Sequence, residues 1–172
     1  TTQTNIGKWT VETPVDCLYI DGEMPAQELH KRFKGLSASA EGEKSNLHLL
    51  SSSANLSKYR ETPILTKEEW RRAIYNFLRS NRSIRLLILD NIACLVPDVS
   101  ENTKKAWDAV NQWLISLRAL GVAVIVLHHE TKKGEQRGTS ARRDNIDIEI
   151  HLTRPADYNR SQGARFEAEF TK

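Results

Sequence analysis

Three polar clusters in the sequence follow short apolar runs and carry residue types that can do chemistry. Asp21-Gly22-Glu23 follows CLYI, Asp90-Asn91 follows IRLLIL, and His128-His129 follows VAVIVL. A carboxylate such as Asp90 can hold Mg²⁺, directly or through a water, and the ion then bridges phosphate oxygens. An acid that ends a strand can equally serve only as a hydrogen-bond acceptor. Asp90 by itself therefore leaves both roles open.

Glu23 and the two histidines offer further roles in the same chemistry. Glu23 stands where a carboxylate can orient an attacking water as a general base. Alternatively, Glu23 is an acid whose only role is to stabilise the positive end of a following helix. The presence of Asp90 at a second strand end favours the catalytic role. His128 and His129 are adjacent on a strand, so they point to opposite faces and make a poor joint ligand pair. We expect one to pack within the fold and the other to face the site, where it can sense a terminal phosphate.

A basic segment, KKGEQRGTSARR at 132–143, follows the third cluster. Its five basic side chains stand against Glu135 alone, which gives a local excess of +4. A charge run of this kind is often only a solvated loop. Because it starts beside the third cluster, it can also meet DNA phosphates or a neighbouring subunit's nucleotide, where an arginine stabilises charge in the transition state. The basic residues are Lys132, Lys133, Arg137, Arg142 and Arg143.

The elements that must position these residues follow from the apolar pattern. Strands are predicted at 17–20, 46–52, 84–89 and 122–127, with the third and fourth buried on both faces, and alternating strands at 145–152 and 164–170. Helices are predicted at 26–36, from a capping box at Thr66-Lys67-Glu68-Glu69 onward, and at 103–120, where Gly121 ends the last. The Ser-, Asn- and Pro-rich residues 51–65 are expected to form a loop.

The order of strands and helices predicts the fold class. Strands alternating with helices indicate an α/β fold with a mainly parallel sheet, helices on both faces and a C-terminal antiparallel hairpin. In such sheets the functional site lies off the carboxyl ends of the strands. All three polar clusters are therefore expected at one edge of the sheet.

The bulk composition suits a single globular domain spanning 1–172. The chain is 39% hydrophobic and carries a net charge of +3, which is too small to indicate a nucleic-acid partner by itself. No apolar run approaches the roughly 20 residues that span a bilayer, and the first residues have no signal-peptide pattern. We expect a cytoplasmic protein without a membrane partner.

Taken together and in order, YIDGEMP, LDN, LHH and QRGTS resemble one known family. They are similar to motifs of the RecA-like P-loop ATPases of the plasmid RepA and AAA-type group, which is related to hexameric replicative helicases. The resemblance runs over nearly all of the chain. It implies ATP and Mg²⁺ as cofactors, single-stranded DNA as a partner, and assembly into a ring.

The resemblance also assigns a role to each matching residue. It implies that Glu23 is the water-activating base, that Asp90 is the Mg²⁺-side acid, and that His129, or less readily His128, senses the γ-phosphate. Asn91 and His128 are expected to lie at the nucleotide. Arg137 in QRGTS would be the arginine finger offered to an adjacent subunit. Lys132, Lys133, Arg142 and Arg143 would face DNA near the channel of the ring.

The sequence departs from this family at the phosphate loop. Members carry GxxxxGK[ST] before the YIDGE strand, whereas only 17 residues precede Leu18 here. Gly7-Lys8 lacks the upstream glycine and is followed by Trp9 in place of Ser or Thr, so it cannot form the phosphate-binding nest. We therefore expect a fragment without the P-loop strand that does not hydrolyse ATP alone. Its unpaired sheet edges are expected to close up or to pair in a dimer.

Three functional hypotheses remain open from the sequence. The first is most of the motor domain of a DNA helicase or a replication or recombination protein. The second is a degenerate RecA-like module that binds DNA or a protein partner without hydrolysis. The third is a metal-dependent hydrolase that uses Asp90, Glu23 and a histidine.

Overall fold

The computed structural model describes residues 5–6, 9–10, 13–38, 46–97, 103–129 and 145–172. The chain divides into two compact units, Thr1–Arg137 and Gly138–Lys172. Each unit is treated by itself below. That residues 1–172 form one domain stays a prediction.

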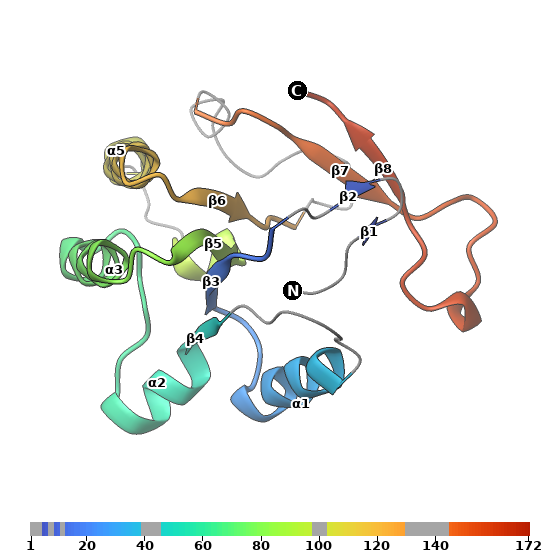
Figure 1. The fold of residues 1–172 in the computed structure, drawn as a ribbon, viewed down its shortest axis with the longest axis horizontal. Coiled ribbons are helices and arrows are strands. Elements are labelled where there is room, and N and C mark those ends of the chain that lie inside the picture. Colours follow the sequence, from blue (N-terminus) through green and yellow to red (C-terminus); the bar gives the residue numbers. More distant parts are fainter. Residues whose placement is uncertain (1–4, 7–8, 11–12, 39–45, 98–102, 130–144) are drawn as a thin grey trace. The chain divides into compact units, whose positions relative to one another are not determined.

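A four-stranded parallel sheet forms the centre of the first unit (Figure 1). Its strands are β3 (Asp16–Asp21), β4 (Leu47–Ser51), β5 (Ile84–Asp90) and β6 (Ala123–Val126), in the order β4-β3-β5-β6. Every neighbouring pair is parallel, as the alternation of strands and helices predicts. Near the N-terminus, β1 (Asn5–Ile6) and β2 (Trp9–Thr10) form a separate antiparallel pair.

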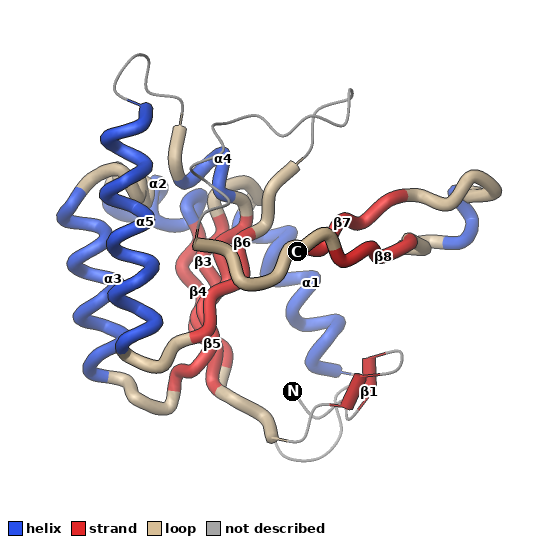
Figure 2. Tube along the Cα trace, turned by 90° about the horizontal axis from the view of Figure 1, so that it is seen from above, coloured by secondary structure: helices blue, strands red, loops and turns tan. Residues whose placement is uncertain are grey.

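Helices cover both faces of this sheet, which confirms the predicted α/β RecA-like arrangement. Helices α3 (Glu68–Ser80) and α5 (Thr103–Ala119) lie side by side on one face, and α1 (Ala26–Ala38) lies on the other (Figure 2). The short α4 (Ile92–Leu95) follows β5 almost directly. None of the helices in the described part of the chain is long and apolar enough to cross a membrane.

The core lies between the sheet and the helix pair α3 and α5. About half of the side chains of β3 and β5, together with the inner faces of the two helices, are almost fully shielded from solvent. Burial of this surface, at about 25 cal/mol per Å², is the main favourable term that holds strand ends in fixed positions. The residues that are 0% exposed include Ile20, Leu87, Leu89, Val110 and Leu117.

The prediction of a loop over residues 51–65 is wrong, because helix α2 occupies Ser52–Tyr59. The Ser51 side chain caps this helix by accepting a hydrogen bond from the backbone N–H of Ala54 at 3.4 Å. Arg60 ends it in the left-handed conformation, with φ of 61°, and donates its N–H to the carbonyl of Leu56. Serine is common both in loops and at helix N-caps, so composition alone does not separate the two structures.

The capping box predicted at Thr66 is also absent from helix α3. Lys67 is the N-cap residue and makes no side-chain capping hydrogen bond. Instead the Arg71 guanidinium, one turn into the helix, donates to the carbonyls of Leu65 at 2.7 Å and Thr66 at 2.8 Å. The predicted apolar face is buried at Ile74 and Leu78.

The prediction that strand β6 is buried on both faces is wrong. Ile125 is 45% exposed and Val126 is 37% exposed. The reason is that, among the described strands, β6 pairs with β5 alone and so lies at the edge of this sheet. A continuous apolar run predicts a buried strand, but the number of neighbouring strands is decided by tertiary structure.

The second unit is an antiparallel hairpin, which confirms the pairing predicted for the last two strands. Strands β7 (Ile150–Thr153) and β8 (Glu167–Phe170) pair with Ile150 opposite Phe170. Both are shorter than the alternating sequence segments. The connection contains the 3₁₀ turn η2 (Arg160–Gln162) and an ion pair between Arg165 and Asp157 at 2.9 Å.

Candidate functional site

The register of β3 and β5 brings two of the polar clusters to one edge. Asp21 pairs directly with Asp90, the last residues of their strands. The backbone N–H of Gly22 then donates to the carbonyl of Asp90 at 2.6 Å. Glu23 therefore leaves the sheet beside the end of β5.

Asp21 shapes the turn that carries Glu23. Its carboxylate is 0% exposed and accepts the backbone N–H of Met24 at 3.1 Å and 3.2 Å, one distance for each oxygen. Burial raises the pKa of this carboxyl above its ordinary value, although the backbone N–H groups of Met24 and Glu23 oppose the shift. Asp21 is thus a structural acid that closes the turn at the end of β3.

Gly22 allows this turn to approach helix α4 closely. A Cβ at position 22 would lie 2.9 Å from the Cβ of Cys94 and 3.1 Å from the Cγ of Leu95. Real Cβ atoms essentially never come as close as the first distance. Glycine at this position is therefore required by packing of the turn against the helix.

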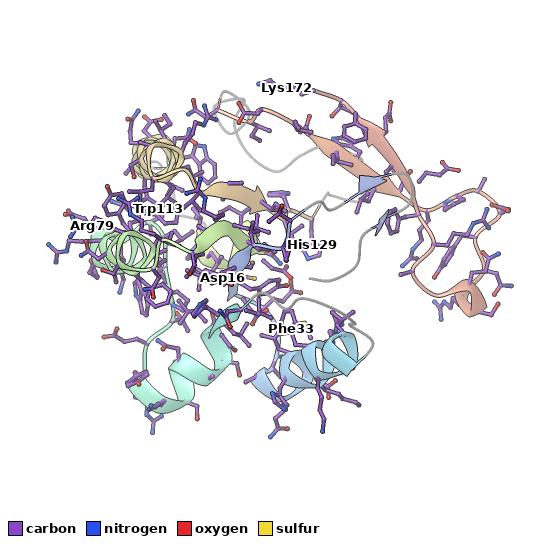
Figure 3. All side chains as sticks on the ribbon, in the orientation of Figure 1. Asp16, Phe33, Arg79, Trp113, His129 and Lys172 are labelled. Carbon is purple, nitrogen blue, oxygen red and sulfur yellow. The ribbon has the colours of Figure 1, made fainter. Side chains whose placement is uncertain are left out.

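Glu23 is the point at which the three clusters meet. The side-chain amide of Asn91 donates to Oε2 of Glu23. Nε2 of His129, which lies just beyond the end of β6 (Figure 3), is 3.3 Å from the same oxygen. The side chain of Glu23 is 52% exposed, so water reaches a carboxylate whose position is set by two other strand ends.

Asn91 uses both ends of its amide. Its Oδ1 accepts the backbone N–H of Cys94 at 3.1 Å and caps helix α4, while its Nδ2 donates to Glu23. The residue is 2% exposed and follows Asp90 through a cis peptide bond. The structure places Asn91 between Glu23 and helix α4, and its predicted contact with a nucleotide stays a prediction.

Asp90 has a partner that the sequence motifs do not indicate. The hydroxyl of Tyr19 donates to Oδ2 of Asp90. The Tyr19 ring packs edge-on against Phe33 of helix α1, with ring centroids 5.2 Å apart and an interplanar angle of 81°. Burial, and then the hydrogen bond to Asp90, raise the pKa of Tyr19 well above its ordinary value. A tyrosine inside an apolar strand resembles an ordinary core residue, but its place two residues before Asp21 puts it on the same face.

The two histidines have different surroundings. The side chain of His129 is 74% exposed and contacts Glu23, whereas His128 is partly buried. The chain after β6 is held by the backbone N–H of Leu127, which donates to the carbonyl of Leu89 at 3.0 Å. The carbonyl of Leu127 in turn accepts the N–H of Ile92 at 2.9 Å. This arrangement favours His129 as the histidine that faces the site.

Comparison with known families decides the class of this domain. The family model described as an AAA domain matches residues 2–135, which include all three polar clusters. The chain belongs to this AAA domain family. Its members are nucleotide-binding, ATPase-like domains that generally use ATP and Mg²⁺. No curated protein and no solved structure matches the chain.

The donor atoms in this AAA domain suit Mg²⁺ better than a transition metal. Mg²⁺ prefers oxygen ligands and keeps several waters, so one or two carboxylates and phosphate oxygens are enough to hold it. The carboxylate of Asp90 provides such oxygens at the edge of the sheet. Across the residues that the structure describes, no group of three or more His, Cys, Asp and Glu side chains could hold a metal ion. The metal-dependent hydrolase hypothesis therefore gains no support from that part of the chain.

The basic segment of the AAA domain lies outside the described residues. This holds for the predicted arginine finger Arg137 and for the predicted DNA-facing residues Lys132, Lys133, Arg142 and Arg143. Their roles stay predictions from the sequence.

Proposed function

We propose that this chain supplies the water-activating and metal-side edge of an ATP-hydrolysing motor domain. The observation that supports the proposal is the contact of Glu23 with Asn91 and His129 at the carboxyl ends of three parallel strands. Ligands of open α/β sheets bind at such strand ends. Membership of the AAA domain family supports ATP as the ligand.

In this proposal Glu23 is the general base. Its exposed carboxylate accepts a proton from the water that attacks the γ-phosphate. Asn91 orients the carboxylate by donating to one of its oxygens. Asp90 would hold Mg²⁺, directly or through a water, and the bound ion would neutralise charge on the phosphate oxygens.

His129 senses the terminal phosphate and is coupled to the base. Because Nε2 of His129 lies 3.3 Å from the same Glu23 oxygen that Asn91 contacts, a change in the contacts of the histidine reaches the general base directly. His128, partly buried, supports the position of its neighbour. Arg137 completes the site of an adjacent subunit by reaching its nucleotide in trans.

The motor proposed is a helicase or a replication or recombination protein that acts on single-stranded DNA as a ring. The support is the excess of basic residues in 132–143, which starts just after His129. Lys132, Lys133, Arg142 and Arg143 would contact DNA phosphates. The logarithm of Kd for DNA should then rise linearly with the logarithm of the salt concentration.

The first experiment is phosphate release from ATP by the 172-residue chain. These residues contain no GxxxxGK[ST], so we expect no turnover above the background of the Glu23→Gln variant. Turnover that Glu23→Gln removes would overturn the expected inactivity and would still support Glu23 as the base. Turnover that survives the substitution would overturn both.

The coding sequence upstream of Thr1 provides the second test. If it encodes GxxxxGK[ST], we expect the longer protein to hydrolyse ATP. Glu23→Gln should then lower turnover by about 10²–10⁴-fold, the contribution typical of general acid–base catalysis. Glu28→Gln, which changes an exposed acid in the first turn of α1, is the matched control and should leave turnover unchanged.

A second candidate function is binding of DNA or a protein partner without hydrolysis. The basic segment together with the lack of GxxxxGK[ST] in these residues favours it. In this case any coding sequence that precedes Thr1 also lacks the motif. The chain should bind single-stranded DNA with an affinity that falls with salt and on Lys132→Ala, while Glu23→Gln should have no effect on binding.

A further inference from the structure

The carboxylate of Asp90 is held on one side by the half-buried phenol of Tyr19. Tyr19 and Asp21 project to the same face of β3 because side chains alternate along a strand, and Asp21 pairs in register with Asp90. Tyr19 is therefore a diagonal cross-strand neighbour of Asp90 on the same face of the sheet. Its hydroxyl donates to Oδ2 of the carboxylate.

The Tyr19 ring is itself fixed by packing. Phe33 of helix α1 meets it edge-on, and Figure 3 shows Phe33 on the side of α1 that faces the sheet. Charged groups around the hydroxyl come from three elements: Asp90 on β5, Asp21 on β3 and Arg32 on α1. The hydroxyl is thus a donor in a fixed place beside one oxygen of Asp90.

A carboxylate with one oxygen occupied in this way presents the other oxygen to a cation. Mg²⁺ demands near-octahedral geometry with single oxygen contacts, whereas Ca²⁺ takes more ligands and accepts carboxylates through both oxygens. A donor on Oδ2 therefore opposes bidentate binding. The described residues give Asp90 no second side-chain hydrogen bond.

We propose that Tyr19 is a positioning residue that makes Asp90 a single-oxygen ligand and so favours Mg²⁺ over Ca²⁺. The inference rests on the proposed function, in which Asp90 is the metal-side acid. The competing explanation is that the half-buried Tyr19 hydroxyl only finds a hydrogen-bond partner in the half-buried carboxylate, as tyrosines packed in a fold commonly do.

The first test follows Mg²⁺ and Ca²⁺ binding by NMR, at one pH, in chains with ¹³C-labelled tyrosine to which MgCl₂ or CaCl₂ alone is added. In the wild type, the ring resonance of Tyr19 should shift on addition of MgCl₂, and Asp90→Asn should abolish the shift.

The second test uses Tyr19→Phe, which keeps the ring against Phe33 but removes the hydrogen-bond donor. Measured by calorimetry, this variant should lower the ratio of Mg²⁺ to Ca²⁺ affinity several-fold. Tyr59→Phe, on an exposed residue of α2, should leave the ratio unchanged.

The outcomes separate the two proposals. An unchanged ratio in Tyr19→Phe, with binding that still depends on Asp90, would overturn the role of Tyr19 alone. No Asp90-dependent response to either salt would overturn Asp90 as the metal-side acid and the present inference with it. If Tyr19→Phe does not fold, Phe33→Leu provides the second variant. It keeps the hydroxyl but loosens the ring, and should lower the ratio by a smaller factor.

Discussion

At the scale of single residues, Asn91 joins the general base to the helix that follows β5. Its amide accepts the N–H of Cys94 at 3.1 Å and donates to Glu23. Aspartate would cap a helix equally well, but it has no donor when ionised and would set a second negative charge beside Glu23. The asparagine is therefore explained by its donor and not by its cap.

This explanation predicts the behaviour of Asn91→Asp. The variant keeps the cap of α4 but removes the donor and adds a like charge, so we expect the free energy of unfolding to fall by about 1–3 kcal/mol at neutral pH. Urea unfolding measures the loss. The double variant Asn91→Asp with Glu23→Gln restores a donor–acceptor pair in reverse and should recover most of it. Equal stability of Asn91→Asp and the wild type would contradict the contact.

Asp21 predicts a pH dependence of stability. Its folded pKa is raised above the ordinary value of 3.8, chiefly by burial. Between 3.8 and the raised value, the folded state binds more protons than the unfolded state, so the free energy of unfolding falls as pH rises. Asp21→Asn keeps an acceptor for Met24 and removes the titration. We compare the free energy of unfolding of Asp21→Asn with that of the wild type by urea unfolding at two pH values. The difference should favour the variant more at neutral pH than at pH near 4. An equal difference at both pH values would refute this.

At the scale of elements, the contact between the β3 turn and helix α4 positions Glu23. Gly22→Ala would place a Cβ 2.9 Å from that of Cys94, and overpacking of this kind typically costs about 1–3 kcal/mol. Thermal and urea unfolding check the loss. Gly35→Ala is the matched control, because a Cβ there meets no atom of the described residues within 4 Å. Alanine within helix α1 should stabilise by about 0.5–1 kcal/mol. A neutral Gly22→Ala would show that the turn and α4 are not closely packed.

Some of these elements could be predicted from the sequence and others could not. The central strands were predictable because IRLLIL and CLYI are apolar runs that end on acids, and parallel pairing then brings those acids to one edge. Helix α2 was not predictable, since Ser51 could cap a helix or form part of a loop. The partner of Asp90 was also missed, because an aromatic residue in an apolar strand gives no sign that its hydroxyl meets a carboxylate on the next strand.

At the scale of the whole molecule, strand β6 is an edge strand of the parallel sheet. Only β5 pairs with it among the described strands. Strands of parallel sheets are normally covered on both faces, yet Ile125 and Val126 are substantially exposed. An edge with free backbone donors and acceptors and apolar side chains is a template for pairing with another chain.

We therefore predict that the 172-residue chain self-associates through β6. Sedimentation velocity over a range of concentrations should show a dimer or larger species that dissociates on dilution. Ile125→Lys puts a charge on the edge, a device by which natural edge strands avoid pairing, and should shift the distribution towards monomer. Leu56→Lys is the matched control, because Leu56 is 50% exposed on helix α2 and does not belong to the edge. If Ile125→Lys and Leu56→Lys associate equally, another surface joins the copies. If the wild type stays monomeric throughout, the prediction is wrong.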